Sequence, residues 1–333
     1  MSDRRKLTVS ASPHVRSLET ASGMMLDVII ALIPALVASA FIFGYRTLIV
    51  TCVSVVSCVL AEYICRKVMK RDNTIGDLSA VVTGILLAFN LPSTIPLWIV
   101  AFGGIVAIVV VKQMFGGIGQ NFVNPALAAR IILMSSFPGK MSGDAYVLPS
   151  VDGVTVTSAS PMFMMSNGEF EALPTLKEMF LGLHSGCLGE VCAAALIIGG
   201  IYLVIRKVIS PVIPCFYIGT VAICMLIAFK GDFTMVAYEL LGGGLLLGAI
   251  FMATDYTTSP ITFKGKIIYA IGCGLITSVI RLFGSLPEGV SFSIILMNIL
   301  VPHIETLTTP KPFGTVKEKK EKKADKKEEV AKA

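Results

Sequence analysis

Charged side chains are scarce in this chain. Asp, Glu, Lys and Arg make up 15% of its 333 residues, and hydrophobic residues make up 54%. Soluble domains usually carry about 25% charged residues. Apolar runs of the roughly 17–25 residues that cross a bilayer also recur along the sequence. We therefore predict an all-α polytopic membrane protein.

Groups for common catalytic chemistry are also few. The chain has three His and eight Cys, with no Cys-x-x-Cys pair, no His/Cys/Asp/Glu set at metal-ligand spacing and no Gly-x4-Gly-Lys-Ser/Thr loop. Metalloenzyme, hydrolase and nucleotide-triphosphatase functions are therefore poorly supported. The cysteines lie in or beside apolar segments, where free cysteine behaves as a small hydrophobic residue.

Ten hydrophobic segments account for most of the chain. They lie near residues 24–43, 46–68, 78–90, 96–114, 124–137, 187–209, 212–229, 235–253, 265–283 and 290–304. The third segment is short and ends at Asn90-Leu91-Pro92, and the eighth runs into "ATDYTTSP" (253–260). Short segments interrupted by Gly or Pro predict broken helices around a central site.

The two halves of the chain resemble each other. "GILLAFNLPSTIP" (84–96) parallels "GAIFMATDYTTSP" (248–260), and "ARIILMSSFP" (129–138) parallels "FSIILMNILVP" (292–302). Each half would hold five spans, in residues 24–137 and 187–305. An odd number of spans inverts the second half in the membrane, so we predict two inverted repeats enclosing a midplane site.

Positive charge predicts the orientation. Most Lys and Arg fall in residues 1–23, in alternate loops and in the low-complexity tail 306–333, all of which the positive-inside rule places in the cytoplasm. The exceptions are Arg46, Lys140, Lys177, Lys230 and Arg281, in the outer loops, and Arg130, within a span. Residues 138–186 then form an outer loop. The tail is predicted to be disordered, and this distribution does not suggest a nucleic-acid partner.

Several acidic residues lie in or at the ends of apolar segments: Asp27, Glu62, Asp77, Glu239, Asp255, Glu288 and Glu305. A carboxylate at the centre of a membrane helix costs roughly 2.5–3.5 kcal/mol, which indicates use. Asp27, Asp77 and Glu305 stand at helix ends, where the headgroup region accommodates them. Asp255 stands at the predicted break, where an acid and unwound carbonyls could hold a cation.

A glycine-rich stretch, "FGGIGQNFVNPALAAR" (115–130), precedes the fifth segment. Backbone amides at a helix start, with Asn121 and Asn124 beside them, attract anions and polar rings. A tight re-entrant turn capped by asparagine explains the spacing equally well. Arg130 either pairs with an acid or binds an anionic cofactor.

The predicted outer loop contains "DGVTVTSASPM" (152–162), a cluster of hydroxyl residues without a neighbouring base. Such a hydroxyl has no nucleophilic activity of its own. The stretch is either an ordinary polar loop or a site that another enzyme modifies.

Four stretches carry a resemblance to a known family: "SPHVRSLETASGMMLDVIIALIPAL" (12–36), "GGIGQNFVNPALAARIIL" (116–133), "MATDYTTSPIT" (252–262) and "IRLFGSLPEGVSFSIILMNILVPHIE" (280–305). They resemble the family that contains the D subunit of the Rnf ion-translocating oxidoreductase complex and the B subunit of the sodium-pumping NADH:quinone oxidoreductase. The resemblance covers nearly the whole chain.

This resemblance implies a covalent flavin. In the family, a flavin transferase joins FMN through its phosphate to the last residue of a pattern resembling Asp-Gly-x-Ser/Thr-apolar-Ser/Thr-Gly-Ala-Thr. The pattern begins here at Asp152 and ends at Ser160, with serine as the acceptor in place of threonine and Ser158 in place of glycine. Thr157 is the alternative acceptor.

The resemblance further implies a non-covalent riboflavin, for which Asn121, Asn124 and Arg130 are the candidate contacts. Asp255, Glu62 and Glu305 are the candidates for coupling electron transfer to Na⁺ or H⁺ movement. The implied setting is a ferredoxin:NAD⁺ oxidoreductase complex with other subunits, in the bacterial cytoplasmic membrane. A urea-channel-like passive transporter is the alternative, and the 152–160 motif argues against it, because a channel has no use for a flavin acceptor.

Overall fold

The computed structural model describes residues 20–141, 146–148, 157–190, 192–284 and 289–310. These residues are predominantly helical, and within them the only β-type pairing is an isolated antiparallel bridge between Val147 and Thr157. The all-α prediction is therefore confirmed for the part of the chain that the structure describes. Asp152, Glu288 and residues 311–333 of the tail fall outside it.

The first half of the chain forms five apolar helices in sequence. They are α1 (Ala21–Phe43), α2 (Arg46–Val68), α3 (Ser79–Phe89), α4 (Leu97–Ile105), which continues as the π-helical segment η2 (Val106–Gln113), and α5 (Pro125–Ser136). Local sequence determines where several of them begin. The Thr20 hydroxyl accepts a hydrogen bond from the Gly23 amide at the start of α1, and Asn124 caps α5 ahead of Pro125.

Short helices connect the two halves: α6 (Pro138–Met141), α7 (Pro161–Ser166), the 3-10 turn η4 (Phe170–Ala172) and α8 (Leu176–Leu181). At the start of α8, Thr175 and Glu178 form a reciprocal capping box. The two hydrogen bonds that Thr175 makes lower the pKa of the exposed Glu178 carboxyl. The region predicted as an outer loop thus contains ordered helical turns.

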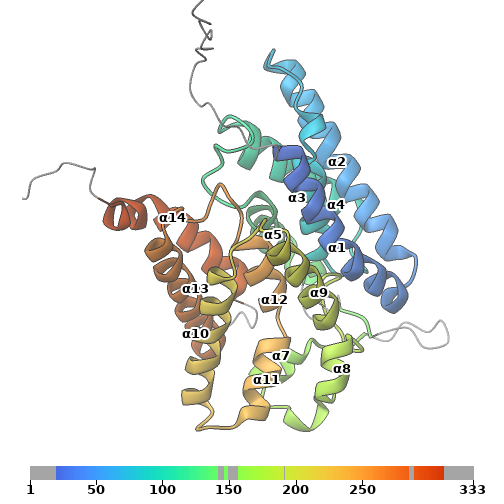
Figure 1. Ribbon diagram of the computed structural model, residues 1–333. Helices are drawn as coiled ribbons and strands as arrows, with labels where there is room; N and C mark the ends of the chain where they lie inside the picture. Colours follow the sequence, from blue (N-terminus) through green and yellow to red (C-terminus); the bar gives the residue numbers. More distant parts are fainter. Residues whose placement is uncertain (1–19, 142–145, 149–156, 191, 285–288, 311–333) are drawn as a thin grey trace, which may run out of the picture.

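The second half repeats the use of long and broken helices. It contains α9 (Ala193–Ile205), α10 (Val212–Ala228), α11 (Phe233–Leu241), α12 (Leu245–Leu247) with the π-helical η5 (Gly248–Met252), α13 (Phe263–Phe283) and α14 (Val290–Thr308). The chain bends by 62° between α11 and the α12–η5 helix. Figure 1 shows α10, α13 and α14 on one side, α1 to α4 on the other, and α5, α9 and α12 between them.

Four of these helices are long and apolar enough to cross a bilayer: α1, α2, α13 and α14. A fifth span results if α11 and α12–η5 are counted together. The remaining predicted segments contain shorter apolar helices: α3, α4–η2, α5, α9 and α10. Each predicted hydrophobic segment therefore contains a helix. Four of these helices, or five if α11 and α12–η5 are counted as one span, are long enough to cross a bilayer.

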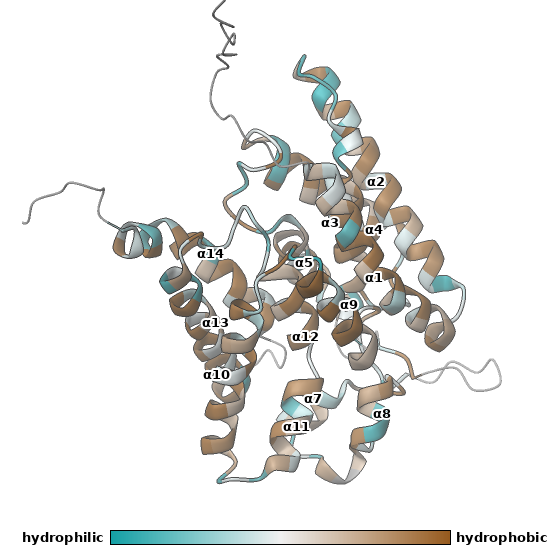
Figure 2. Cartoon of the chain, in the orientation of Figure 1, coloured by the Kyte–Doolittle hydropathy of each residue, from teal (hydrophilic) through white to brown (hydrophobic). Residues whose placement is uncertain are grey.

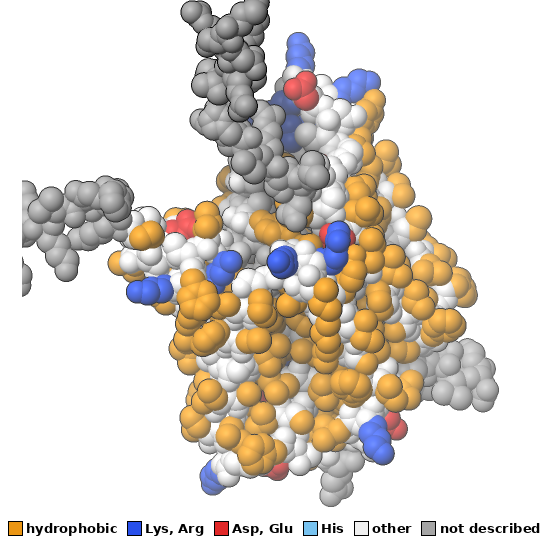
Figure 3. Space-filling model, in the orientation of Figure 1, with side chains coloured by type: hydrophobic (Ala, Val, Ile, Leu, Met, Phe, Trp, Pro, Cys, Tyr) orange, Lys and Arg blue, Asp and Glu red, His pale blue; other side chains and the backbone are white. Residues whose placement is uncertain are grey.

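The outer surface is suited to lipid. Hydrophobic residues predominate along the long helices (Figure 2), and the space-filling view shows a broad apolar face with Lys and Arg mainly toward its margins (Figure 3). Phe41, Ile64 and Phe283 are examples of large side chains that are exposed on these helices. A surface of this kind is stable in a bilayer and not in water.

The two halves meet through several helix pairs. α1 packs against α9, and α5 packs against α14, while α10, α13 and α14 pack together within the second half. Gly199 of α9 lies so close to the Ala31 carbonyl that an added Cβ would sit 2.1 Å from its oxygen. Small residues thus allow backbone contact between the halves, as is usual between membrane helices.

Candidate functional site

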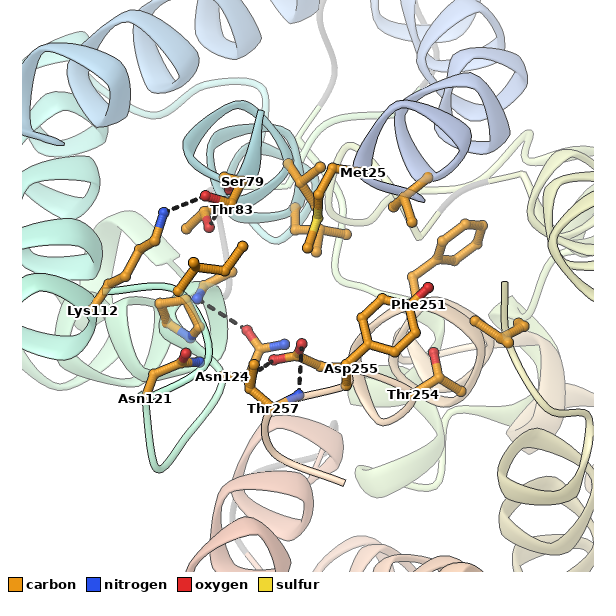
Figure 4. Close-up of a pocket in the computed structure, with 18 of the residues that line it drawn as sticks. Met25, Ser79, Thr83, Lys112, Asn121, Asn124, Phe251, Thr254, Asp255 and Thr257 are labelled. Carbon is orange, nitrogen blue, oxygen red and sulfur yellow. Dashed lines mark hydrogen bonds between the residues drawn. The ribbon is translucent and has the colours of Figure 1, made fainter. Parts of the chain in front are cut away.

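A pocket lies between the two halves of the chain (Figure 4). The first half contributes residues from α1, α3, η2 and the glycine-rich stretch, and the second half contributes α9, η5 and the segment 253–262. The pocket is partly open and has a volume of about 90 Å³. Polar groups from distant parts of the sequence, among them Ser79, Lys112, Asn121 and Asp255, line one space.

Lys112 brings a buried charge to this pocket. Its Nζ lies 2.9 Å from Glu62 Oε2 and donates a second hydrogen bond to the Ser79 hydroxyl. Glu62 is fully buried in α2 and also accepts hydrogen bonds from Gln113 and Thr74 at 2.8 and 3.0 Å. A buried carboxylate is stable only with such partners. Glu62 therefore reaches the pocket through Lys112, not directly.

Asp255 faces the pocket from the second half. Its carboxylate accepts hydrogen bonds from the hydroxyls of Thr257 and Thr258 at 3.1 and 3.3 Å. The residue lies in the segment after η5, which also carries both of these threonines. A carboxylate at an unwound segment of this kind can exchange protons or bind cations.

Asn121 and Asn124 both line the pocket, and the structure separates their roles. The Asn124 Oδ1 accepts hydrogen bonds from the amides of Ala126 and Leu127, so this side chain caps α5. Its Nδ2 donates to the Met252 carbonyl across the boundary between the halves. Asn121 donates to the Val123 carbonyl, and within the described residues its Oδ1 accepts no hydrogen bond. Capping thus explains Asn124, and Asn121 is the better ligand candidate.

Arg130 is not in this pocket but in a buried cluster nearby. Its Nη1 donates to Asn90 Oδ1 at 2.6 Å, and its Nη2 lies 3.2 Å from Glu190 Oε1. Asn90 ends α3 and also lies 3.7 Å from the Met252 sulfur. Of the two predicted roles for Arg130, the structure shows pairing with an acid. That acid, Glu190, is not among the candidates that the sequence indicates.

The predicted flavin acceptor lies in a different place, at the start of α7. The Ser160 hydroxyl caps this helix by accepting a hydrogen bond from the Phe163 amide, and the residue is 9% exposed. The Ser185 hydroxyl donates to the neighbouring Ala159 carbonyl. Thr157 is exposed, whereas Asp152 lies outside the described residues. Ser160 is therefore buried as a helix cap, whereas Thr157 is accessible at the surface.

Glu305 also lies apart from the pocket. Its carboxylate accepts a hydrogen bond from the Ile261 amide and so ties α14 to the segment that carries Asp255. Lys112, Ser79 and Glu190 are polar residues of these sites that sequence reasoning missed. Charge counting groups Lys112 with the cations of the loops. Its position near the end of an apolar run, with Glu62 in an earlier apolar segment, was the available signal that the two could pair.

The side chains that line the pocket could bind a flavin, but the pocket is smaller than a flavin requires. Asn121, Thr83 and Thr257 offer hydrogen-bonding groups, and Phe251 offers a ring. Ligand pockets usually measure about 300–1,000 Å³, so a flavin would extend beyond the 90 Å³ enclosed by this chain. No group of three or more His, Cys, Asp or Glu that could hold a metal ion occurs in the described ranges.

Comparison with known proteins shows a match over nearly the whole chain. The NQR2, RnfD, RnfE family matches residues 8–314. Among similar proteins, the D subunit of the Na⁺-translocating ferredoxin:NAD⁺ oxidoreductase complex of Acetobacterium woodii is 49% identical, with 96% of this chain and 98% of that protein aligned.

Two relatives of lower identity are also named as D subunits of oxidoreductase complexes. The D subunit of the proton-translocating ferredoxin:NAD⁺ oxidoreductase complex of Clostridium ljungdahlii is 42% identical over 92% of this chain and 96% of its own. The D subunit of the ion-translocating oxidoreductase complex of Halorhodospira halophila is 34% identical over 91% and 94%. The names of the Acetobacterium and Clostridium proteins specify Na⁺ and protons respectively, and the name of the Halorhodospira protein specifies no ion.

Proposed function

Because the chain belongs to the NQR2, RnfD, RnfE family, we propose that it is the D subunit of a membrane-bound, ion-translocating ferredoxin:NAD⁺ oxidoreductase complex of the Rnf type. The observation that carries this proposal is the 49% identity to such a protein over 96% of the chain. The complex is the enzyme, and this chain acts within it beside other subunits. The passive-channel alternative has no comparable support, since the similar proteins are named as oxidoreductase subunits.

We propose that the chain crosses the bacterial cytoplasmic membrane ten times as two inverted repeats with cytoplasmic termini. An offset of about 164 residues pairs α2 with α10, α3 with α12–η5, α4–η2 with α13, and α5 with α14. The short α3 (11 residues) is paired with the bent region at α12–η5, and the short α5 (12 residues) is paired with the longer α14 (19 residues). Short helices that end inside the protein suit a repeat fold with its site near the midplane.

The family pattern supports a covalent FMN on Ser160, formed by a flavin transferase that recognises residues 152–160. The position of Ser160 as the last of the nine residues that begin at Asp152 fits the pattern. Because the hydroxyl is buried as a helix cap, the transferase would act before α7 packs or would displace it. The exposed Thr157 is the competing acceptor.

The pocket between the halves supports a non-covalent riboflavin. Asn121 would bind a polar edge of the ring system, and Phe251 would lie against its apolar surface. The part that the chain does not enclose would face a neighbouring subunit. A flavin accepts and passes on electrons, and the protein orients it and sets the charge around it.

Ion coupling is assigned to the acidic groups at this pocket. Asp255 lines the pocket, and Glu62 is connected to it through the Lys112 ammonium. A change of charge in the pocket would alter the cation affinity of Asp255 because little solvent screens the two. Glu305 would act on Asp255 indirectly, by holding the segment that starts at Ile261.

The proposal can be tested in inverted membrane vesicles from the host organism. Vesicles with wild-type protein should couple ferredoxin-dependent NAD⁺ reduction to uptake of ²²Na⁺ or H⁺, and vesicles from a deletion strain should lose both. If the deletion strain keeps both activities, the proposed function is wrong. Asp255→Asn should restore less ion uptake than the exposed control Asp72→Asn, and equal uptake would remove Asp255 from coupling.

A further inference from the structure

An apolar groove runs along the outside of the first half, between α2 and α4–η2. Its volume is about 480 Å³, and its lining includes Leu60, Ala61, Ile64, Cys65 and Ile105. The Ser57 hydroxyl, its one polar side chain apart from cysteine, donates to the Ser54 carbonyl of its own helix. The hydroxyl proton is therefore used within α2, and an occupant of the groove meets almost only hydrocarbon.

Cations gather at one end of this groove. Lys67, Lys70 and Arg71 are exposed at the end of α2, one turn or less from Val68, the last groove residue of that helix. Lys67 lies over the Tyr63 ring, with its Nζ 5.8 Å from the ring centroid. The adjacent acid in this turn is Asp72, so a positive excess remains.

Arg66 does not belong to this exposed group. It is buried and points toward Gly117, where an added Cβ would lie 2.3 Å from its Nη2. The exposed cations are therefore those next to the groove, and they are not used to hold the interior together.

The length of the groove matches one leaflet of a bilayer. From Ser57 to Val68 the axis of α2 rises by about 16 Å at 1.5 Å per residue. Half of a hydrocarbon core of roughly 30 Å is about 15 Å. An acyl chain lying in the groove would thus reach from the midplane to the level of the cations.

We infer that the groove between α2 and α4–η2 binds one anionic phospholipid, with an acyl chain against Ala61, Ile64 and Cys65 and the phosphate at Lys67 and Arg71. A zwitterionic lipid would fill the groove equally well but would leave the positive excess uncompensated. Basic residues at a membrane surface each contribute about 1 kcal/mol toward anionic lipid. The inference rests on the membrane location of the chain and does not depend on its redox role.

A second apolar groove provides an internal comparison. It lies between α9 and α10, has a volume of about 240 Å³ and includes Ile201 and Cys215 in its lining. Of the cations at its end, Arg206 is paired with Asp27 at 3.2 Å, which leaves Lys207. This groove should therefore distinguish less between anionic and zwitterionic lipid.

The test is native mass spectrometry of the full chain purified in detergent after incubation with vesicles of palmitoyl-oleoyl phosphatidylglycerol or phosphatidylcholine. The wild type should retain phosphatidylglycerol preferentially. Lys67→Gln/Arg71→Gln should weaken this retention about 30-fold, because two cations are removed. The control Lys264→Gln/Lys266→Gln removes two cations at the start of α13 and should leave the retention of phosphatidylglycerol unchanged.

A second variant tests the groove with its charges intact. Cys65→Trp would fill the groove and should abolish retention of phosphatidylglycerol, while an unchanged melting temperature shows that the fold is kept. The inference is overturned by equal retention of the two lipids, by equal effects of the two double variants, or by full retention in Cys65→Trp. It is also overturned if a photoreactive maleimide on Cys65 cross-links to a polypeptide in the native complex.

Discussion

At the scale of single residues, buried ion pairs connect parts of the chain that are far apart in sequence. Glu62 pairs with Lys112, Arg130 with Glu190, and Glu239 with Arg281, and all six residues are buried. Burying a charge is costly, and an opposite charge at about 3 Å offsets much of that cost. These pairs therefore disfavour arrangements of the helices that would leave one buried charge without its partner.

The pair of Glu239 and Arg281 allows the cost to be measured away from the pocket. Arg281 Nη1 lies 2.9 Å from Glu239 Oε2, and Nη2 donates to the carbonyls of Gly242 and Gly243 at the break after α11. Arg281→Met should lower the free energy of unfolding by about 3–5 kcal/mol, because it leaves the buried carboxylate unpaired. Thermal unfolding in detergent measures this loss.

A double-mutant cycle provides the control. Arg281→Met/Glu239→Leu removes both charges and should cost clearly less than the sum of the two single variants. Additive losses would show that the two side chains do not stabilise each other and would contradict the account of this pair.

Asn121 is the residue on which the pocket proposal depends most. Asn121→Leu keeps the size of the side chain and removes its hydrogen bonds, so retention of non-covalent riboflavin should weaken about tenfold. Riboflavin extracted from the purified complex gives the measure. Asn167→Leu, at the exposed end of α7, is the matched control. Equal riboflavin content in the two variants would rule out Asn121 as a contact.

Residues of the site differ in how well the sequence could identify them. Asp255 and Asn121 could be singled out because a carboxylate or an amide beside a Gly- or Pro-rich break is unusual in an apolar chain. Glu190 was missed, although it lies near the start of the hydrophobic segment 187–209, and its partner Arg130 is 60 positions earlier. Pairing over that distance is determined by the helix packing, which periodicity does not reveal.

At the scale of helices, the closest packing depends on glycine. α3 crosses α2 at Gly84, where an added Cβ would lie 2.7 Å from the Val55 Cα. The Ser54 hydroxyl donates to the Gly84 carbonyl at 2.7 Å, which adds a polar contact at the crossing. Backbone atoms cannot move aside as a side chain can, so this contact determines the distance between the two helices.

Gly84→Ala should therefore destabilise the protein by about 1–3 kcal/mol, the usual cost of overpacking. Gly219→Ala is the control, because an added Cβ there meets nothing within 4 Å. Thermal unfolding of the two variants in the same detergent tests the difference. Equal melting temperatures would show that α2 and α3 separate at little cost.

The sequence predicted the helices better than their shapes. Hydrophobicity and the Asn90-Leu91-Pro92 boundary located α3 well, and the matching stretches indicated corresponding elements in the two halves. The 62° bend between α11 and α12 was not predicted as such, since hydrophobicity marks 235–253 as one segment. The glycines at 242–244 permit the bend, but Arg281 holds it in place, and that contact is tertiary.

At the scale of the whole molecule, the proposed orientation makes a prediction about access. With Thr157 outside and Lys70 in the cytoplasm, Thr157→Cys in intact cells should react with a membrane-impermeant maleimide. Lys70→Cys should react only after the membrane is opened. The wild type, which contains cysteines in its helices, provides the background. The reverse pattern of labelling would invert the topology.

The measurement that tests the central claim most directly is whether this chain carries a covalent flavin. The chain is co-expressed with a flavin transferase, and a denaturing gel under ultraviolet light is combined with intact-mass analysis of the wild type, Ser160→Ala and Thr157→Ala. The account predicts a fluorescent wild-type band with the added mass of one phosphoester-linked FMN, lost in Ser160→Ala and kept in Thr157→Ala. The account would be contradicted if Ser160→Ala still gave a fluorescent band with the added mass of one FMN. It would also be contradicted if the wild type carried no covalent flavin.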